Sequence, residues 1–453
     1  MLEKLFKLEQ NHTNVKTELV AGVTTFMTMA YILAVNPSIL GAAGMDTTAV
    51  MLATCLASFV GSVLMGLMAN LPFALSAGMG INAFFAYTVV LSYGYSWQVA
   101  LLSVFIEGLI FIALSLGGVR EKLFDSIPLS LKQGVSVGLG MFIAFIGMQN
   151  AGIVVGSATL ISIVDFQTNF HSAGICALLA IVGTLLTAIM YIKKVPGAIL
   201  LGILGTWVLG MLCQLTGLYV PDAAAGFYSL FPSFSLTDFS RLGETFGQCF
   251  HFDMHNVGIF NFIVVVISFL FVDIFDTLGT LIGVATKADM LDENGRLPAI
   301  RPALLADAIA TAAGAMLGTS TTTTFVESAA GVGAGGRTGL TAVVTALLFL
   351  ASTLLAPIFT AIPSFATAPA LIIVGFLMFS TIAKIELNEE SFSEAIPAYL
   401  CILGIPFFYS ISEGIAIGVI SYAVINLCCG KAKKVNPLMY ILSVLFILKF
   451  IFL

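Results

Sequence analysis

Long apolar stretches separated by short polar links run through the whole chain. An α-helix needs about 20 apolar residues to cross the hydrocarbon core of a bilayer. Ten stretches have roughly that length, at 17–40, 48–70, 94–117, 131–150, 172–192, 197–220, 258–283, 302–318, 339–361 and 365–383. Four shorter or interrupted stretches fill the gaps, at 72–90, 319–337, 396–408 and 410–429. The pattern predicts an all-α polytopic membrane protein with fourteen transmembrane segments.

The positions of the cationic residues fit this count. Loops rich in Lys and Arg stay in the cytoplasm, and each cationic cluster follows an even number of segments: 4–16, 120–132, 193–194, 287–301, 337, 384 and 431–434. The link at 221–257 follows the seventh segment and contains Arg241 as its only Lys or Arg. We therefore predict a multi-pass protein of the cell membrane with both termini in the cytoplasm.

The two ends of the chain differ from the spanning segments. Apolar and charged residues alternate in residues 1–16, which predicts an amphipathic segment on the membrane surface. This segment lacks the cleavage site of a signal peptide. Residues 437–453 follow a basic link and predict an interfacial or partly inserted helix, with a fifteenth segment as the alternative.

The two sets of seven segments resemble each other. Ile127 is followed by Gly140 after 13 positions, and Ile362 is followed by Gly375 at the same separation. The third and tenth segments, 72–90 and 319–337, are both interrupted, and the Thr-rich start of the tenth favours a strand before a short helix. Because seven is an odd number, the second set must be inverted. Paired interrupted segments of this kind indicate the binding site of a transporter.

Three carboxylates lie in or beside these segments. A charge at membrane depth costs a few kcal/mol and therefore marks a substrate or ion pathway. Asp273 and Asp276 share one helix face, and Glu327 lies at the predicted junction of strand and half-helix. Helix capping or a structural hydrogen bond is the alternative for one of the two aspartates. Glu107 is left open between a hydrogen bond to a neighbouring helix and a proton site. Asp307, near Arg301, is left open between a surface ion pair or helix cap and coupling.

The predicted half-helix starts bring an amide and a carboxylate together. Asn82 and Glu327 would lie there, beside free backbone N–H groups. This combination suits a flat neutral heterocycle that carries both N–H groups and lone pairs. Phe325 is a candidate for stacking on such a ring, with ordinary packing as the alternative. Thr324 and Ser328 complete the predicted contact set.

Composition narrows the class further. With 59% hydrophobic and 9% charged residues, the chain is too apolar for a soluble domain. The net charge of -6 is spread without a basic patch, so nucleic acid is not an expected partner. The seven cysteines show no metal-ligand spacing, and we predict neither a metal nor a cofactor.

Four motifs carry a family resemblance that covers nearly the whole chain. They resemble the adenine/guanine/hypoxanthine permeases within the xanthine/uracil permease (nucleobase-cation symporter) superfamily. In this sequence they read NVKTELVAGVTTFMTMAY (14–31), AGMGINAFFAY (77–87), FVDIFDTLGT (271–280) and TSTTTTFVESAAG (319–331).

The resemblance implies an inverted repeat of seven plus seven segments, with segments 3 and 10 broken. A substrate-carrying core would comprise 17–118 and 258–361, and a gate 119–220 and 362–429. The link 221–257 would be extracytoplasmic, and 1–16 and 430–453 would be terminal segments. It implies proton-coupled uptake of a purine base by an elevator movement, the proton being the co-transported ion. A homodimer through the gate is compatible with it.

Carried over by position, the resemblance puts Asn82, Asp273 and Glu327 in contact with substrate. Asp276 is then the first coupling candidate, with Asp273 and Asp307 as the others. One departure is Ser76, where the family pattern has proline; it is expected to loosen the strand without removing the site.

Two other functions are weighed against transport of a purine. An intramembrane aspartyl hydrolase would need its acids on opposing helices, whereas Asp273 and Asp276 lie three apart on one. An anion transporter of the same general fold would place carboxylates against its own substrate.

Overall fold

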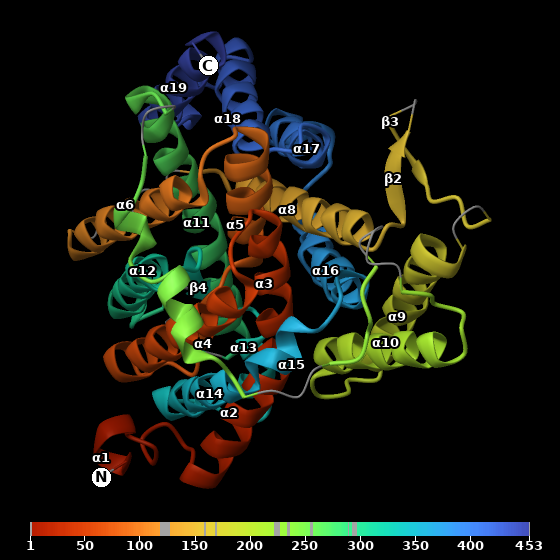
Figure 1. Ribbon diagram of the computed structural model, residues 1–453. Coiled ribbons are helices and arrows are strands. Elements are labelled where there is room, and N and C mark those ends of the chain that lie inside the picture. Colours follow the sequence, from red (N-terminus) through yellow and green to blue (C-terminus); the bar gives the residue numbers. More distant parts are fainter. Residues whose placement is uncertain are drawn as a thin grey trace.

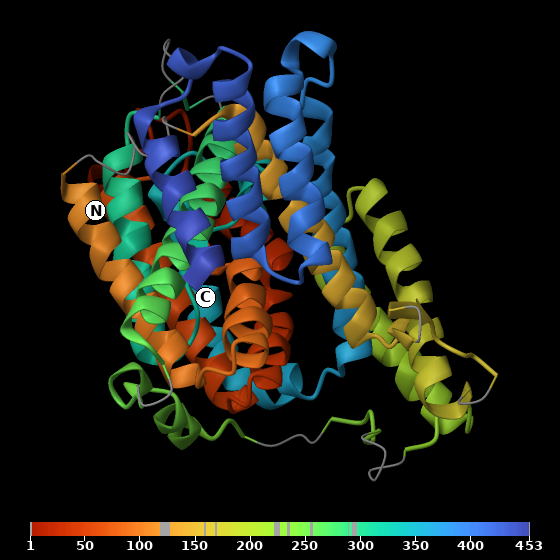
Figure 2. The ribbon, with the colours of Figure 1, turned by 90° about the horizontal axis from the view of Figure 1, so that it is seen from above.

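The computed structural model describes residues 2–117, 127–157, 160–167, 170–221, 227–232, 236–253, 257–288, 290–291 and 297–452. Within these ranges the chain is a bundle of helices (Figures 1 and 2). Ten helical segments are long and apolar enough to cross a membrane: Val15–Ala42, Thr47–Ala69, Trp97–Leu116, Leu129–Asn150, Phe170–Ile192, Ala198–Leu215, Ile300–Leu317, Gly339–Thr360, Ser364–Lys384 and Ile411–Cys428. The predicted helical, multi-pass class is confirmed, whereas fourteen segments in an inverted repeat stay a prediction.

The elements before the long link 221–257 have the following bounds. The helices are α1 (Leu2–Phe6), α2 (Val15–Met29), α3 (Ile32–Ala42), α4 (Thr47–Leu64), α5 (Met79–Ala83), α6 (Trp97–Leu116), α8 (Leu129–Asn150), α9 (Ile175–Ile192) and α10 (Ala198–Leu215). The π-helical turns η1 (Met65–Ala69), η2 (Phe84–Ser92) and η3 (Phe170–Gly174) extend α4 and α5 and precede α9. The strands are β1 (Leu75–Ala77), β2 (Val154–Ser157) and β3 (Leu160–Ile163).

The later elements include the helix that carries both aspartates. They are α11 (Ile259–Lys287), α12 (Ile300–Leu317), β4 (Thr322–Thr324), α13 (Ser328–Gly333), α14 (Gly339–Ser352), α15 (Ala356–Thr360), α16 (Ser364–Phe379), α17 (Phe392–Phe407), α18 (Ile411–Cys428) and α19 (Pro437–Phe452). Two short 3-10 turns lie in the link, η5 (Phe239–Glu244) and η6 (Gln248–Phe250). The other 3-10 turns are η7 (Thr353–Leu355) after α14, η8 (Ser380–Lys384) after α16, η9 (Glu389–Ser391) before α17 and η10 (Ala432–Lys434) after α18.

The helices pack in two sets. In one, α8 contacts α16 and α17, α17 contacts α18, and α9 contacts α10 and α16. In the other, α4 contacts α12 and α14, α6 contacts α11 and α12, and α2 contacts α13 and α14. Figure 1 shows α8, α9, α10 and α16 on the opposite side of the bundle from α2, α4, α12 and α14.

Two glycines at matching places in the two halves of the chain meet where α8 crosses α16. A Cβ atom added to Gly140 would lie 2.5 Å from the carbonyl oxygen of Gly375, and one added to Gly375 would lie 2.5 Å from that of Gly140. These separations are far too short for any side chain, so the close crossing requires glycine at both positions. The sequence repeat thus corresponds to a contact between its two copies.

Glu18 joins α2 to the start of α14. The side chain is fully buried, and its carboxylate accepts hydrogen bonds from the backbone N–H groups of Arg337 (2.9 Å), Thr338 (3.3 Å) and Thr341 (3.1 Å). The Thr341 hydroxyl donates a fourth at 2.7 Å. A carboxylate suits this place because the first N–H groups of a helix have no partner within it. No pattern in the sequence predicted this role for Glu18.

The structure differs from the sequence prediction in two places of the fold. The strands β2 and β3 form an antiparallel hairpin between α8 and α9, where no strand was predicted. Asp307 is fully buried in α12, and not at the surface as one of the alternatives for it assumed. The burial arises because α12 packs on both α4 and α6.

Candidate functional site

Two short strands meet in the middle of the bundle and lead into short helices. β1 pairs antiparallel with β4, with Ser76 opposite Thr323. The pairing continues beyond the strands, because Gly78 N–H donates to the Thr321 carbonyl and Phe325 N–H to the Ala74 carbonyl, each at 3.0 Å. An unpaired strand cannot survive at membrane depth, so each strand satisfies the backbone of the other. Because the strands are antiparallel, α5 and α13 leave from opposite ends of the pair.

Ser76 is hydrogen-bonded within this strand. Its hydroxyl lies 2.7 Å from the hydroxyl of Ser58 on α4, and Ser62 on the same helix bonds both backbone groups of Leu75. Where the family pattern has proline, this chain thus has a serine whose hydroxyl contacts the neighbouring helix α4.

Glu327 is the residue immediately before α13, at the junction that the sequence predicts. Its side chain is half-buried, and its Oε1 accepts a hydrogen bond of 2.7 Å from the hydroxyl of Tyr31. The Thr28 hydroxyl lies 3.4 Å from the Glu327 carbonyl oxygen. The first membrane-crossing helical segment thus positions this carboxylate. Sequence analysis did not assign Tyr31 a function, although it lies in a quoted motif.

Asp273 lies in a buried cluster with Asp307. Thr277 Oγ1 donates to Asp273 Oδ1 at 2.6 Å and lies 3.3 Å from Asp307 Oδ2. The same oxygen is 2.7 Å from the hydroxyl of Thr323 on β4. A hydroxyl has one hydrogen, so Thr277 can serve only one of the two carboxylates at a time. The cluster connects α11, α12 and the strand pair.

Asp276 points toward the start of α5. A Cβ atom added to Gly78 would lie 3.2 Å from Asp276 Oδ2 and 2.7 Å from Thr323 Cγ2. Asp276 is half-buried, and its carboxylate is within electrostatic range of both Asp273 and Glu327. The structure thus gathers the three predicted carboxylates around the strand pair.

Asn82 lies one turn inside α5 and not at its start. The strand pairing extends to Gly78, so α5 begins only at Met79. The Asn82 side chain is fully buried, and its Oδ1 accepts a hydrogen bond from Ser320. Asn82 therefore ties α5 to the segment that precedes β4.

The remaining predicted contact residues occupy different surroundings. The Ser328 hydroxyl accepts a 3.0 Å hydrogen bond from Ala74 N–H, so it supports the junction of strand and helix. Phe325 is buried in the main hydrophobic cluster, with 6% of its surface exposed. The Thr324 hydroxyl is buried and has no hydrogen-bond partner in the described part of the chain. Of these three, Thr324 is the residue whose polar group is left without a partner in the described part of the chain.

Glu107, which the sequence left open, is fully buried in α6 and accepts a 2.9 Å hydrogen bond from Thr321 Oγ1. It thereby ties α6 to the segment before β4. Within the described ranges, no three His, Cys, Asp or Glu side chains are grouped so that they could hold a metal ion.

Replacing Gly78 by Val is expected to abolish substrate uptake while the protein still reaches the membrane. The added atoms would overlap Thr323 and crowd Asp276, and overpacking of this kind costs about 1–3 kcal/mol. Uptake of labelled substrate, normalised to the membrane level of the protein, measures the effect. Gly333→Ala is the matched control because a Cβ atom there, on α13, meets open space. Full uptake by Gly78→Val would contradict the assigned crowding.

Comparison with known proteins assigns the chain to a family. The sequence profile of the permease family, named for xanthine and uracil, matches residues 16–417. A guanine/hypoxanthine permease of Bacillus subtilis is 44% identical over 464 residues, with 100% of both chains covered. An adenine permease of Escherichia coli is 42% identical over 454 residues, covering 100% of this chain and 96% of the other.

Among solved structures, the transmembrane domain of a cyanobacterial bicarbonate transporter has the same fold. The TM-score is 0.64 at 16% identity, covering 90% of this chain and 97% of that one. At this identity the likeness concerns the fold alone. On the sequence matches, this chain is a transport protein of the membrane and not an enzyme, and it belongs to the xanthine/uracil permease family.

Proposed function

We propose that this chain is a proton-coupled symporter that imports purine nucleobases: adenine, guanine, hypoxanthine or several of these. The observation that carries the proposal is the position of Glu327. A half-buried carboxylate stands at the start of a half-helix, held by Tyr31, in a bundle of membrane-crossing helices. The relatives named as adenine and guanine/hypoxanthine permeases support the substrate class.

The surroundings of Glu327 suit a purine ring. A carboxylate accepts hydrogen bonds from ring and exocyclic N–H groups, and the unpartnered hydroxyl of Thr324 can donate or accept one more. Phe325, which lies between these two residues in the sequence, stays a predicted stacking partner, although in this structure it is buried in the main hydrophobic cluster. Asn82 and Asp273 stay in the predicted contact set. In this structure both side chains are buried and accept hydrogen bonds from protein groups, Ser320 and Thr277 respectively.

Proton coupling would rest on the aspartates of α11. Asp276 is half-buried beside the strand pair and within electrostatic range of Glu327. A proton on Asp276 would relieve the repulsion among the carboxylates while the substrate is bound. Proton binding and substrate binding would thereby favour each other. Asp273 and Asp307 share the hydroxyl of Thr277 and are the alternative coupling acids.

For the movement we propose an elevator, with a core of 17–118 and 258–361 sliding against a gate of 119–220 and 362–429. The two packing sets of helices support this division. We propose further that the chain is an inverted repeat of seven plus seven segments. The contact between Gly140 and Gly375 supports a repeat, and the strands β1 and β4 support breaks in the third and tenth segments. Both termini would be cytoplasmic, and the described part of the link at 221–257 lies at the opposite end of the bundle from η10 (Figure 2). A homodimer through the gate stays a prediction.

Transport of an anion is a weaker candidate, although the fold is shared with a bicarbonate transporter. Asp276 and Glu327 would repel an anionic substrate in the same space. The neutral purine ring meets no such repulsion.

A competition assay tests the function. Cells that lack their own purine permeases and express this chain should take up labelled hypoxanthine, adenine or guanine above the background of empty cells. At least one unlabelled purine in tenfold excess over a saturating labelled purine should suppress that uptake by roughly 90%, as expected for competition at one site. Uracil and bicarbonate should leave it unchanged. Uptake of no purine at equal membrane expression would refute the proposal, and suppression by bicarbonate would favour the anion transporter.

A further inference from the structure

A hollow outside the predicted transport site opens where α18 ends and α19 begins. It has a volume of about 390 Å³ and is closed on its other side by Ile127 and Pro128, which precede α8. Lys433, Lys434, Asn436 and Tyr422 also line it. Val435 and Pro437 complete the wall, which thus combines two lysines and two other polar residues with four apolar ones.

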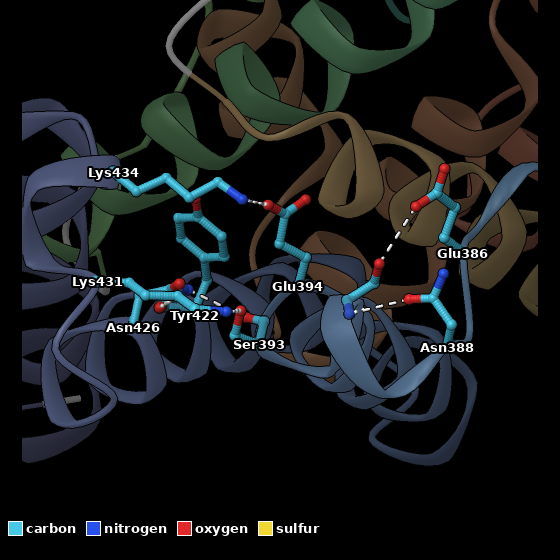
Figure 3. A network of polar contacts seen from close by, with 9 residues as sticks. Glu386, Asn388, Ser393, Glu394, Tyr422, Asn426, Lys431 and Lys434 are labelled. Carbon is cyan, nitrogen blue, oxygen red and sulfur yellow. Dashed lines mark hydrogen bonds and ion pairs between the residues drawn. The ribbon is translucent and has the colours of Figure 1, made fainter.

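The polar contacts around this hollow leave an excess of positive charge. Lys434 forms an ion pair with Glu394, and Lys431 donates a 3.0 Å hydrogen bond to Ser393 Oγ (Figure 3). Lys433 is exposed and has no ion-pair partner among the described residues. Of the residues that line the hollow, Lys433 and Lys434 are cationic and none is acidic, so pairing of Lys434 with Glu394 leaves the charge of Lys433 unbalanced.

The same network fixes the shape of the hollow. Asn426 Nδ2 donates to the Ser393 carbonyl at 3.0 Å and to the Tyr422 carbonyl at 2.9 Å, which ties the end of α18 to the start of α17 (Figure 3). The Tyr440 hydroxyl donates to the Ala432 carbonyl at 3.3 Å and so ties α19 back to η10. The lysines are carried on a braced turn and not on a free loop.

An apolar groove lies on α19 next to this turn. It has a volume of about 320 Å³ and is lined by Tyr440, Ile441, Val444 and Leu445. Ile441 and Val444 are 58% and 55% exposed. The opposite face of α19 is buried against the protein, where Phe446 meets Phe271 of α11 at 5.9 Å between ring centroids. The exposed face therefore needs an apolar neighbour other than this chain.

A cationic hollow beside an apolar groove matches a molecule with an anionic head and a hydrocarbon tail. We propose that this place binds an anionic phospholipid, with its phosphate between Lys433 and Lys434 and an acyl chain along the groove of α19. Basic pockets at the ends of membrane helices hold anionic head groups by this charge complementarity. If both termini are cytoplasmic, as proposed above, this lipid comes from the cytoplasmic leaflet.

Native mass spectrometry of the purified full-length chain tests the site. Phosphatidylglycerol and phosphatidylcholine with identical acyl chains are added in turn, and the lipid-bound fraction is measured. The native protein should retain phosphatidylglycerol in preference to phosphatidylcholine. Each surface lysine is expected to contribute about fivefold, so Lys433→Gln with Lys434→Gln should lower phosphatidylglycerol affinity about 25-fold. Lys433→Gln alone, which breaks no ion pair, should lower it about fivefold.

Lys384→Gln is the matched control, because Lys384 is an exposed lysine at the end of η8 that does not line the hollow. It should leave lipid retention unchanged. Equal retention of the two lipids, or undiminished retention in the double variant, would overturn the proposal. Displacement of the lipid by millimolar inorganic phosphate would also overturn it, in favour of a site for soluble anions. None of these readouts depends on transport, so the result stands apart from the proposed function.

Discussion

Replacing Glu327 by Gln is expected to weaken purine binding roughly 10- to 100-fold while the protein still reaches the membrane. The amide keeps the size of the side chain but loses one acceptor and the negative charge. Its Tyr31 partner would also face an NH2 group in one of the two amide orientations. Leaving a buried polar contact unpaired costs about 1–3 kcal/mol, and more where a charge is involved.

Equilibrium binding of a labelled purine to the purified protein measures this loss. Tyr31→Phe removes only the hydroxyl that holds Glu327, so its effect should have the same sign and be smaller. Glu389→Gln, an exposed glutamate in η9, is the control that should bind normally. Affinity close to that of the native protein in Glu327→Gln would remove this residue from the substrate site.

Replacing Asp276 by Asn is expected to abolish uphill accumulation of purine while binding and exchange persist. The amide resembles a permanently protonated carboxyl group, so the carrier can still bind and move its substrate but cannot follow the proton gradient. In the native protein, accumulation should rise as external pH falls, because the proton is a co-substrate on that side, and should collapse when a protonophore is added. In Asp276→Asn, neither change should affect the remaining exchange.

Transport into proteoliposomes with imposed gradients separates these outcomes, with counterflow of labelled purine as the measure of exchange. Asp276→Asn that still accumulates purine in a pH-dependent way would move the coupling role to Asp273 or Asp307, which share Thr277. Accumulation by the native protein that ignored the proton gradient and followed sodium would refute proton coupling. The same carboxylates would then act as cation ligands.

The sequence by itself determined the class of the protein and the region of its site. Hydrophobic stretches of spanning length dictate membrane helices because a backbone in hydrocarbon must satisfy its own hydrogen bonds. The β-branched run at 319–324 predicted a strand, and Glu327 was predicted at the junction with the half-helix, where it lies. Local chemistry decides these features, so they can be read along the chain.

Only the tertiary structure decided which distant groups meet. The strand β4 could be predicted, but its partner β1 lies about 250 residues away, and nothing local encodes that pairing. Tyr31 on Glu327, and Thr277 between Asp273 and Asp307, likewise depend on helices from separate parts of the chain.

Burial was decided in the same way. Glu18 and Asp307 have sequence neighbours typical of a helix end near the membrane surface, yet both are fully buried. Glu18 is buried because α14 packs against α2, and Asp307 because α4 and α6 pack against α12. A charge can be placed there only because the fold supplies donors: three backbone N–H groups and a hydroxyl for Glu18, and Thr277 near Asp307. Burying a charge is unfavourable in any sequence. Only the three-dimensional arrangement decides whether neighbouring groups donate the hydrogen bonds that compensate for the lost water.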